Sequence, residues 1–345
     1  MIHAETLPPT AQSAYADLLA SLLVAPLPAR GMSWFTREIK ERRYWYLQYS
    51  IGNARRSVYV GPDDPSTRAL VERAQALQAQ DLDARPRRER LAGTCVAAGA
   101  YAPALAEARV YEAISQAGLF ELGGVLIGTH AFMNLGNQLG VRWIGGDART
   151  EDIDIAHDPT ITIAAPDRQM DLPAVLQAAC RGVIPVPALN PKHPSTSFSI
   201  RGEALTVSLL TPARGRGDAP VKLQALNAAA EPLRFLEYVI DGSQPAAVPT
   251  AAGLLVRLPD AARFALHKLV VSQRRIPAFA NKSRKDIAQA GAIISTLCEL
   301  RPADLERAWR AAEVLGGKFM TQLRAATRVL EPSVRGRLRD LTEPA

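Results

Sequence analysis

The spacing of hydrophobic residues changes along the chain, and the N-terminal part has the two-residue period of β-strands. This alternation predicts three short strands, over Ser33–Ile39, Arg43–Tyr49 and Arg55–Val60. The short segments between them favour an antiparallel meander. A helix is expected before the strands, over Ala11–Leu23, and a polar helix after them, over Ser66–Leu82.

Residues 93–215 contain segments with the two-residue period of strands and segments with the 3.6-residue period of helices. After Arg216 the helical period dominates. Arg85–Arg88 is expected to be a linker or an exposed helix start. In the middle part, strands are predicted at Val125–Gly128, Asp152–Ala156, Ile161–Ala164, Ser197–Ile200 and Leu205–Leu210, and helices at Ala104–Ala117, Thr129–Leu139 and Leu172–Arg181. In the last part, helices are predicted at Pro259–Arg275, Ser283–Leu300, Pro302–Leu315 and Gly317–Leu330.

These patterns predict an α+β fold with three domains. The first, residues 1–92, would contain a helix and a three-stranded β module. The second, residues 93–215, would be a mixed core of strands and helices, and the third, residues 216–345, a helical domain.

The composition indicates a folded protein in a reducing compartment. Hydrophobic residues make up 48% of the chain and charged residues 22%, which is typical of globular proteins. The three cysteines, Cys95, Cys180 and Cys298, are far apart, which argues against a disulfide framework or a zinc site and favours the cytoplasm. We expect no signal peptide and no membrane-spanning helix. The net charge of +7 favours polyanionic partners such as nucleic acids.

The middle strand of the meander carries aromatic residues on both faces. Tyr44 and Tyr46 share one face, and Trp45 and Tyr49 the other. The basic residues nearby are Arg37, Lys40, Arg42, Arg43, Arg55 and Arg56. One interpretation is a surface that binds phosphates and stacks on bases, as in a nucleic-acid-binding sheet. The alternative, equally favoured, is a small sheet with half-buried tyrosines and a solvated basic rim.

A strand that leads through a glycine into a helix is the first candidate ligand site. Gly128 would let the backbone approach a ligand, and the helix from Thr129 would present unpaired N–H groups to an anion. His130 could contact phosphate, although it lacks partners at metal-ligand spacing and a structural role is favoured. The alternative is packing, because strand, glycine and helix recur throughout α/β proteins.

Two acidic residues on the next strand are the second candidate. Asp152 and Asp154 point to the same side, while Ile153 and Ile155 point into a core. Neighbouring carboxylates repel each other, which favours a bound cation such as Mg²⁺, shared with the phosphates of a nucleotide. The alternative is an acidic pair on an exposed edge strand.

Together, the Gly128–Thr129 turn and Asp152-Ile153-Asp154 resemble the nucleotidyltransferase fold shared with DNA polymerase beta. The segment Arg149–Ile155 is most similar to bacterial members, including toxins of AbiE-type toxin/antitoxin systems. The whole chain resembles a poorly characterised bacterial family with a Tyr-Trp-Tyr-rich N-terminal module. The resemblance extends through Leu205–Pro212, Leu266–Leu269 and Lys282–Asp286. It implies a nucleotidyltransferase-type mixed sheet with flanking helices, a small antiparallel β module and a C-terminal helical domain.

The resemblance also implies a site for a nucleoside triphosphate with Mg²⁺ or Mn²⁺. The residues it assigns to catalysis are Asp152, Asp154 and Lys268, with both aspartates binding the metal. Those it assigns to the nucleotide are Gly128, Thr129, His130, Arg149, Thr150, Ser208 and Asp286. For Asp286 we favour a different role, because Ser283 and Asp286 have the spacing of a capping box at a helix start.

Ser208 departs from the family pattern. Relatives usually carry an aspartate there, as a third carboxylate for the metal, and a serine hydroxyl does not supply that charge. Glu203 lies five residues away and so would face the opposite side of a regular strand. Two hypotheses follow. The first is transfer of a nucleoside monophosphate to a hydroxyl of tRNA, another RNA or a protein. The second is a catalytically degenerate protein that binds nucleotide or nucleic acid in a regulatory or defence role, with an antitoxin as a candidate partner.

Overall fold

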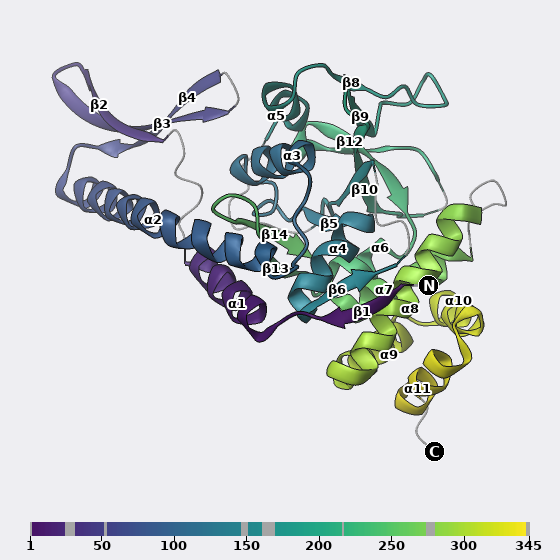
Figure 1. The fold of residues 1–345 in the computed structure, drawn as a ribbon. Coiled ribbons are helices and arrows are strands. Elements are labelled where there is room, and N and C mark those ends of the chain that lie inside the picture. Colours follow the sequence, from purple (N-terminus) through teal and green to yellow (C-terminus); the bar gives the residue numbers. More distant parts are fainter. Residues whose placement is uncertain are drawn as a thin grey trace.

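A computed structural model describes residues 2–24, 32–51, 54–145, 151–160, 170–215, 217–273 and 280–342, with side chains except at 49–51 and 54–56 (Figure 1). The fold is a mixed sheet with flanking helices, with antiparallel strands near the N-terminus and helices at the C-terminus, which confirms the predicted fold class. The expected strand Ile161–Ala164 lies outside the described residues. In the described parts of the chain, no helix combines the length and the apolar character needed to cross a membrane.

The central sheet positions the candidate site. Its seven strands within the described residues are β5 (Val125–Ile127), β7 (Asp152–Ala156), β8 (Val183–Pro185), β9 (Ser197–Ile200), β10 (Leu205–Pro212), β11 (Val221–Leu223) and β12 (Ala228–Leu233). Strand β10 runs parallel to β7 and β12, while β5 is antiparallel to β7. Strand β9 pairs with the first half of β10 and β8 pairs with β9. The sheet is anchored because Ile153, Ile155 and Val207 are fully buried.

Helices cover the sheet and form the C-terminal part. Those beside the sheet are α3 (Leu105–Gln116), α4 (Gly128–Leu139), α5 (Leu172–Ala179) and α6 (Leu236–Ile240). The C-terminal ones are α7 (Ala261–Ser272), α8 (Ala280–Leu300), α9 (Pro302–Leu315), α10 (Gly317–Ala326) and α11 (Pro332–Thr342), with short 3₁₀ turns at Gln224–Leu226 and Thr327–Val329. Helix α7 contacts α8, α9 and α10, and it is buried almost all round because its residues are mostly apolar. Helix α11 was not predicted from the sequence.

The expectation of mainly helical structure after Arg216 is wrong for residues 221–258. This segment holds β11, β12, β13 (Gln244–Val248) and β14 (Leu254–Leu258). Strands β12 and β13 are rich in alanine, which has little intrinsic preference for strands, so pairing with distant residues decides their conformation. The central sheet therefore continues beyond residue 215, although the domain limits remain a prediction.

Residues 3–23 pack on the core. Strand β1 (His3–Thr6) pairs with β6 (Val141–Ile144), and α1 (Pro9–Leu23) contacts β13 and β14. Helix α2 (Pro65–Ala97) is longer than expected and continues through Pro86, so the linker or helix start expected at Arg85–Arg88 is wrong.

Tertiary contacts explain why α2 continues. The Arg88 side chain is 7% exposed and pairs with Asp81 at 2.9 Å, while Ala92 and Cys95 are buried in a cluster shared with α1. Burial of these residues compensates for the hydrogen bond that Pro86 cannot donate.

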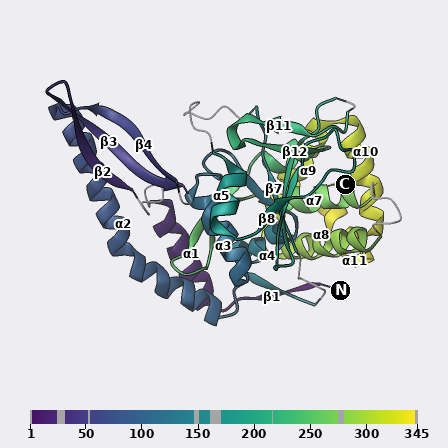
Figure 2. The same ribbon diagram turned by 90° about the horizontal axis from the view of Figure 1, so that it is seen from above.

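The N-terminal sheet consists of β2 (Ser33–Ile39), β3 (Arg42–Ile51) and β4 (Ala54–Pro62). They form the predicted antiparallel meander, with Lys40 and Glu41 at positive φ in the first turn. Helix α2 extends from the rest of the molecule and the sheet lies along its outer part (Figure 2).

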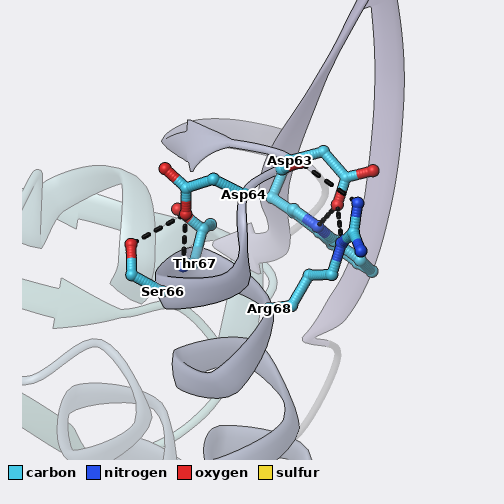
Figure 3. Close-up of polar contacts among 6 residues, drawn as sticks. Asp63, Asp64, Ser66, Thr67 and Arg68 are labelled. Carbon is cyan, nitrogen blue, oxygen red and sulfur yellow. Dashed lines mark hydrogen bonds and ion pairs between the residues drawn. The ribbon is translucent and has the colours of Figure 1, made fainter.

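The joint between β4 and α2 is a polar cluster (Figure 3). Asp64 caps the helix by accepting hydrogen bonds from Thr67 N and Ser66 Oγ, both at 2.7 Å. Asp63 accepts from Arg68 Nε at 2.6 Å and from Trp45 Nε1 at 2.9 Å. These bonds tie the middle strand of the sheet to the first turn of α2.

Candidate functional site

An acidic side chain of β7 lies directly against the first residue of helix α4. Gly128 has φ +68°, and a Cβ atom placed on it would lie 2.1 Å from Asp154 Oδ2. Any other residue would clash with the carboxylate and would be strained at this φ. The structure therefore brings the predicted glycine turn and the acidic strand together, and Asp152 lies on the same face of β7 as Asp154.

The local charges make the acidic pair a place for a cation. Burial, and then the negative charge of Asp152, raise the pKa of Asp154 from 3.8 to about 6, although Lys268 and Lys282 act in the opposite direction. Asp152 Oδ2 lies 3.7 Å from Lys282 Nζ, and both side chains are about half exposed. The raised pKa means that two ionised carboxylates are unfavourable here, and additional positive charge would stabilise them.

Lys268 of α7 and Asp286 of α8 form a buried ion pair. The Nζ atom donates to Asp286 Oδ1 at 2.7 Å, and the side chains are only 10% and 9% exposed. The capping role favoured for Asp286 is therefore wrong. Helix α8 already includes Ala280, so Ser283 lies inside it and donates to the Ser272 carbonyl oxygen at 2.8 Å.

Ser208 occupies the sheet position beside Asp154. In the parallel pairing of β7 and β10, Ser208 is opposite Asp154 and Thr206 is opposite Asp152. The Ser208 hydroxyl is hydrogen-bonded to that of Ser197 on β9 at 3.0 Å. Hydroxyl groups thus lie at the position where the sequence resemblance implies a third carboxylate.

Glu203 does not replace the missing acid. Its side chain pairs with Arg109 of α3 at 3.4 Å. Glu203 lies before β10 begins at Leu205, so the expectation for a regular strand stays untested. Among the residues that the structure describes, no cluster of three or more His, Cys, Asp or Glu side chains could hold a metal ion. The acidic side chains that β7 brings to the site are Asp152 and Asp154, and two carboxylates could hold one ion that keeps water and phosphate ligands.

The start of α4 is buried beside the acids. Thr129 is 8% and His130 1% exposed, and burial lowers the pKa of His130 to about 4, with a smaller contribution from the charge of Lys285. His130 packs edge-on against Tyr111 and is neutral at pH 7. His157, at the end of β7, lies 2.9 Å from the Leu122 carbonyl oxygen through Nε2, which is a structural contact.

Two of the candidate nucleotide contacts, Arg149 and Thr150, lie outside the described residues. The sequence also has a basic stretch between two predicted helices, formed by Arg274, Arg275, Lys282, Arg284 and Lys285, of which Arg274 and Arg275 lie outside the described residues. From that stretch the structure brings Lys282 to Asp152, a contact that the sequence analysis missed. From the sequence, the basic stretch could clamp a triphosphate or an RNA backbone or could equally be an exposed loop, and no pattern paired Lys282 with Asp152. The position of Lys282 four residues before Asp286, on one face of a helix, was a signal that could have linked it to the site.

The comparisons with known proteins cover the site. A protein-family model described as Nucleotidyltransferase matches residues 106–313, which span α3 to α9 and every described residue of the site. No curated protein and no solved structure matches the chain. The N-terminal sheet and α2 lie outside the matched segment.

Proposed function

This chain belongs to the nucleotidyltransferase family, and on that premise we propose that it transfers a nucleoside monophosphate from a nucleoside triphosphate to a hydroxyl group, with Mg²⁺ or Mn²⁺. The contact between Gly128 and Asp154 carries the proposal. It joins a helix N-terminus, which favours phosphate, to a carboxylate pair, which favours a divalent cation. A triphosphate with its metal ion matches both halves of this site.

Each side chain has a role that follows from its place. Asp152 and Asp154 would hold the cation, whose charge neutralises phosphate oxygens. The backbone N–H groups from Gly128 to His130 would bind the β and γ phosphates. Lys268 and Lys282, whose charges lower the pKa of Asp154, would add positive potential around the transferred group. Such transfer depends on positioning and electrostatics, with pyrophosphate leaving in line with the attacking hydroxyl.

The favoured acceptor is tRNA or another RNA, with a protein hydroxyl as the alternative. The net charge of +7 supports a polyanionic acceptor. We further propose that the reaction takes place in the cytoplasm, where three unpaired cysteines would stay reduced. An antitoxin partner is part of the same proposal and rests on the sequence resemblance.

The second candidate function is nucleotide binding without turnover, in a regulatory or defence role. The hydrogen-bonded hydroxyl pair of Ser208 and Ser197, beside Asp154, favours it. Without a third carboxylate the described residues offer fewer acidic ligands than two-metal catalysis uses. The two candidates therefore differ in whether one ion is enough for chemistry.

The test is label transfer from α-labelled nucleoside triphosphates to total tRNA, with Mg²⁺ or Mn²⁺. We expect transfer by the unchanged protein, loss in Asp152→Ala, and no loss in Asp17→Ala, an exposed acid on α1. Transfer by Ser208→Asp alone would instead favour the non-catalytic candidate for the natural chain. Failure to bind any nucleoside triphosphate, measured by calorimetry with Mg²⁺, would contradict both candidates.

A further inference from the structure

One face of the N-terminal sheet carries a continuous row of aromatic rings. The register places Phe35, Tyr46 and Tyr59 side by side on the three strands. The ring centroids are 5.7 Å apart for Phe35 and Tyr46 and 5.7 Å apart for Tyr46 and Tyr59. Tyr44 extends the row, with its ring 6.0 Å from that of Tyr59. We call this side of the sheet the aromatic face.

The aromatic face is positively charged. The Arg37 guanidinium lies 5.4 Å from the ring centroids of both Phe35 and Tyr46. Arg42 shares this face, because side chains two residues apart on β3 point the same way. Within the described strands of this sheet the one acidic residue is Glu38, which lies on the opposite face and pairs with Arg43 at 3.8 Å.

Helix α2 lies on the other side of the sheet. Gly61 pairs with Trp45 on the face opposite the rings, and a Cβ placed on Gly61 would lie 2.7 Å from Thr67 Oγ1 of α2. The Trp45 ring bonds to Asp63 at the same joint. The aromatic face is therefore turned away from α2, and Tyr59 is 53% exposed. Figure 1 shows the sheet standing apart from the central sheet, and Figure 2 shows the same from above.

We propose that the aromatic face binds single-stranded nucleic acid. Bases stack on exposed tyrosines and on arginine, and phosphates are attracted to the basic rim. Residues 33–62 contain six basic and two acidic residues, a net charge of +4 out of +7 for the whole chain. Neighbouring strands display the rings in a fixed row, which matches successive unpaired bases. The inference that the bound nucleic acid also accepts the nucleoside monophosphate rests on the proposed function. The inference that the aromatic face binds nucleic acid does not.

Two matched pairs of variants test the proposal in the full-length chain. Tyr59 and Val58 are neighbours on β4, both about half exposed, and lie on opposite faces. Arg42 and Arg43 are neighbours on β3, again on opposite faces, and both are exposed. Tyr59→Ala and Arg42→Gln change the aromatic face, while Val58→Ala and Arg43→Gln make comparable changes on the other.

The readout is fluorescence anisotropy with labelled single-stranded RNA of about 20 nucleotides, longer than the sites of about 4–16 nucleotides that such surfaces cover. We expect Tyr59→Ala to weaken binding about fivefold or more, the loss that one stacked base explains, and Tyr59→Phe to retain it. Arg42→Gln should weaken binding and reduce the dependence of log K on log salt by about 0.7. Val58→Ala and Arg43→Gln should bind like the unchanged protein.

DNA of the same sequence and the matching RNA duplex complete the experiment. Binding of RNA alone identifies RNA as the ligand, whereas equal binding of DNA identifies unpaired bases of either kind. Duplex binding as tight as single-strand binding would overturn the proposal, as would equal losses within either variant pair or no binding at low salt. The assay contains no nucleoside triphosphate and no metal ion. Its result is therefore independent of whether the candidate site around Asp152 and Asp154 transfers nucleotides.

Discussion

Two ion pairs of similar chemistry lie in opposite surroundings. Lys268 and Asp286 meet at 2.7 Å with side chains 10% and 9% exposed, whereas Arg43 and Glu38 lie 3.8 Å apart and are 67% and 62% exposed. The first pair has lost most of its hydration, so each charge depends on the other. The second keeps its water, so neither charge needs its partner. Removing one partner should therefore destabilise the fold strongly at the buried pair and hardly at the exposed pair.

The largest effect is expected from breaking the buried pair. Lys268→Met would leave Asp286 charged in the interface of α7 and α8, which should lower the free energy of unfolding by about 3–5 kcal/mol. Urea unfolding at pH 7 measures this loss. The physical reason is that the buried carboxylate would lose the ammonium group that lies 2.7 Å from it and would gain little hydration in exchange.

A double variant separates stability from function. Lys268→Met with Asp286→Leu removes both charges and should recover most of the lost stability. Nucleotide binding should stay weak in both variants, because the ammonium group of Lys268 is gone and, of the two lysines, only Lys282 still contributes positive charge near Asp154. A single variant that unfolds like the unchanged protein would show that the pair is not buried in solution.

The next effect concerns His267, which precedes Lys268 on α7. Burial lowers the pKa of His267 from 6.5 to about 4; the Arg234 carbonyl oxygen and Asp286 oppose this shift, and the charge of Lys268 adds to it. The unfolded chain therefore takes up a proton at a higher pH than the folded chain does. The contribution of His267 to the free energy of unfolding is complete above pH 6.5. It is lost as the pH decreases toward 4, by up to about 3 kcal/mol.

Urea unfolding at pH 7 and pH 5 measures this effect. His267→Asn should reduce the difference between the two pH values, whereas His3→Asn, at an exposed histidine, should leave it unchanged. His130, with a pKa lowered to about 4, contributes in the same direction, so part of the pH dependence should remain in His267→Asn. An identical pH dependence in the unchanged protein and His267→Asn would contradict the neutral, buried state of this ring.

A third prediction compares two glycines with similar backbone angles. Gly128 and Gly202 have φ +68° and +83°, so alanine at either should cost about 1–2 kcal/mol of stability. At Gly202 no atom lies within 4 Å of the added Cβ, but at Gly128 the Cβ would lie 2.1 Å from Asp154 Oδ2. Gly128→Ala should therefore also displace this carboxylate and weaken Mg²⁺-dependent nucleotide binding, measured by calorimetry. If the two variants bound the nucleotide with equal affinity, Asp154 would not be part of the binding site.

The same contrast explains what the sequence could predict. Strand β7, with Asp152 and Asp154, and strand β9 have the predicted bounds, because alternation and flanking turns are local signals. Strand β2 of the exposed sheet was also predicted with the correct bounds. Each of these segments carries its own pattern, whichever segment it later packs against.

Features that depend on distant partners could not be predicted from single segments. The capping box at Ser283 and Asp286 looked like a helix start, but burial against Lys268 of α7 assigns Asp286 another role. Helix α2 passes through Pro86 because contacts with α1 support it. The register that sets Ser208 beside Asp154 joins residues more than fifty positions apart, and no local pattern encodes it.

The smallest effect should come from the exposed pair. Arg43→Gln removes one partner of Glu38, yet both side chains remain hydrated, so the free energy of unfolding should change by less than about 0.5 kcal/mol. Urea unfolding of Arg43→Gln and of Lys268→Met under the same conditions measures the difference. The two variants are comparable because each removes one positive charge from one ion pair. If Arg43→Gln were as destabilising as Lys268→Met, exposure would not govern the energy of these pairs. The face of the N-terminal sheet opposite the aromatic face would then have to be covered in solution, because the pair of Arg43 and Glu38 lies there.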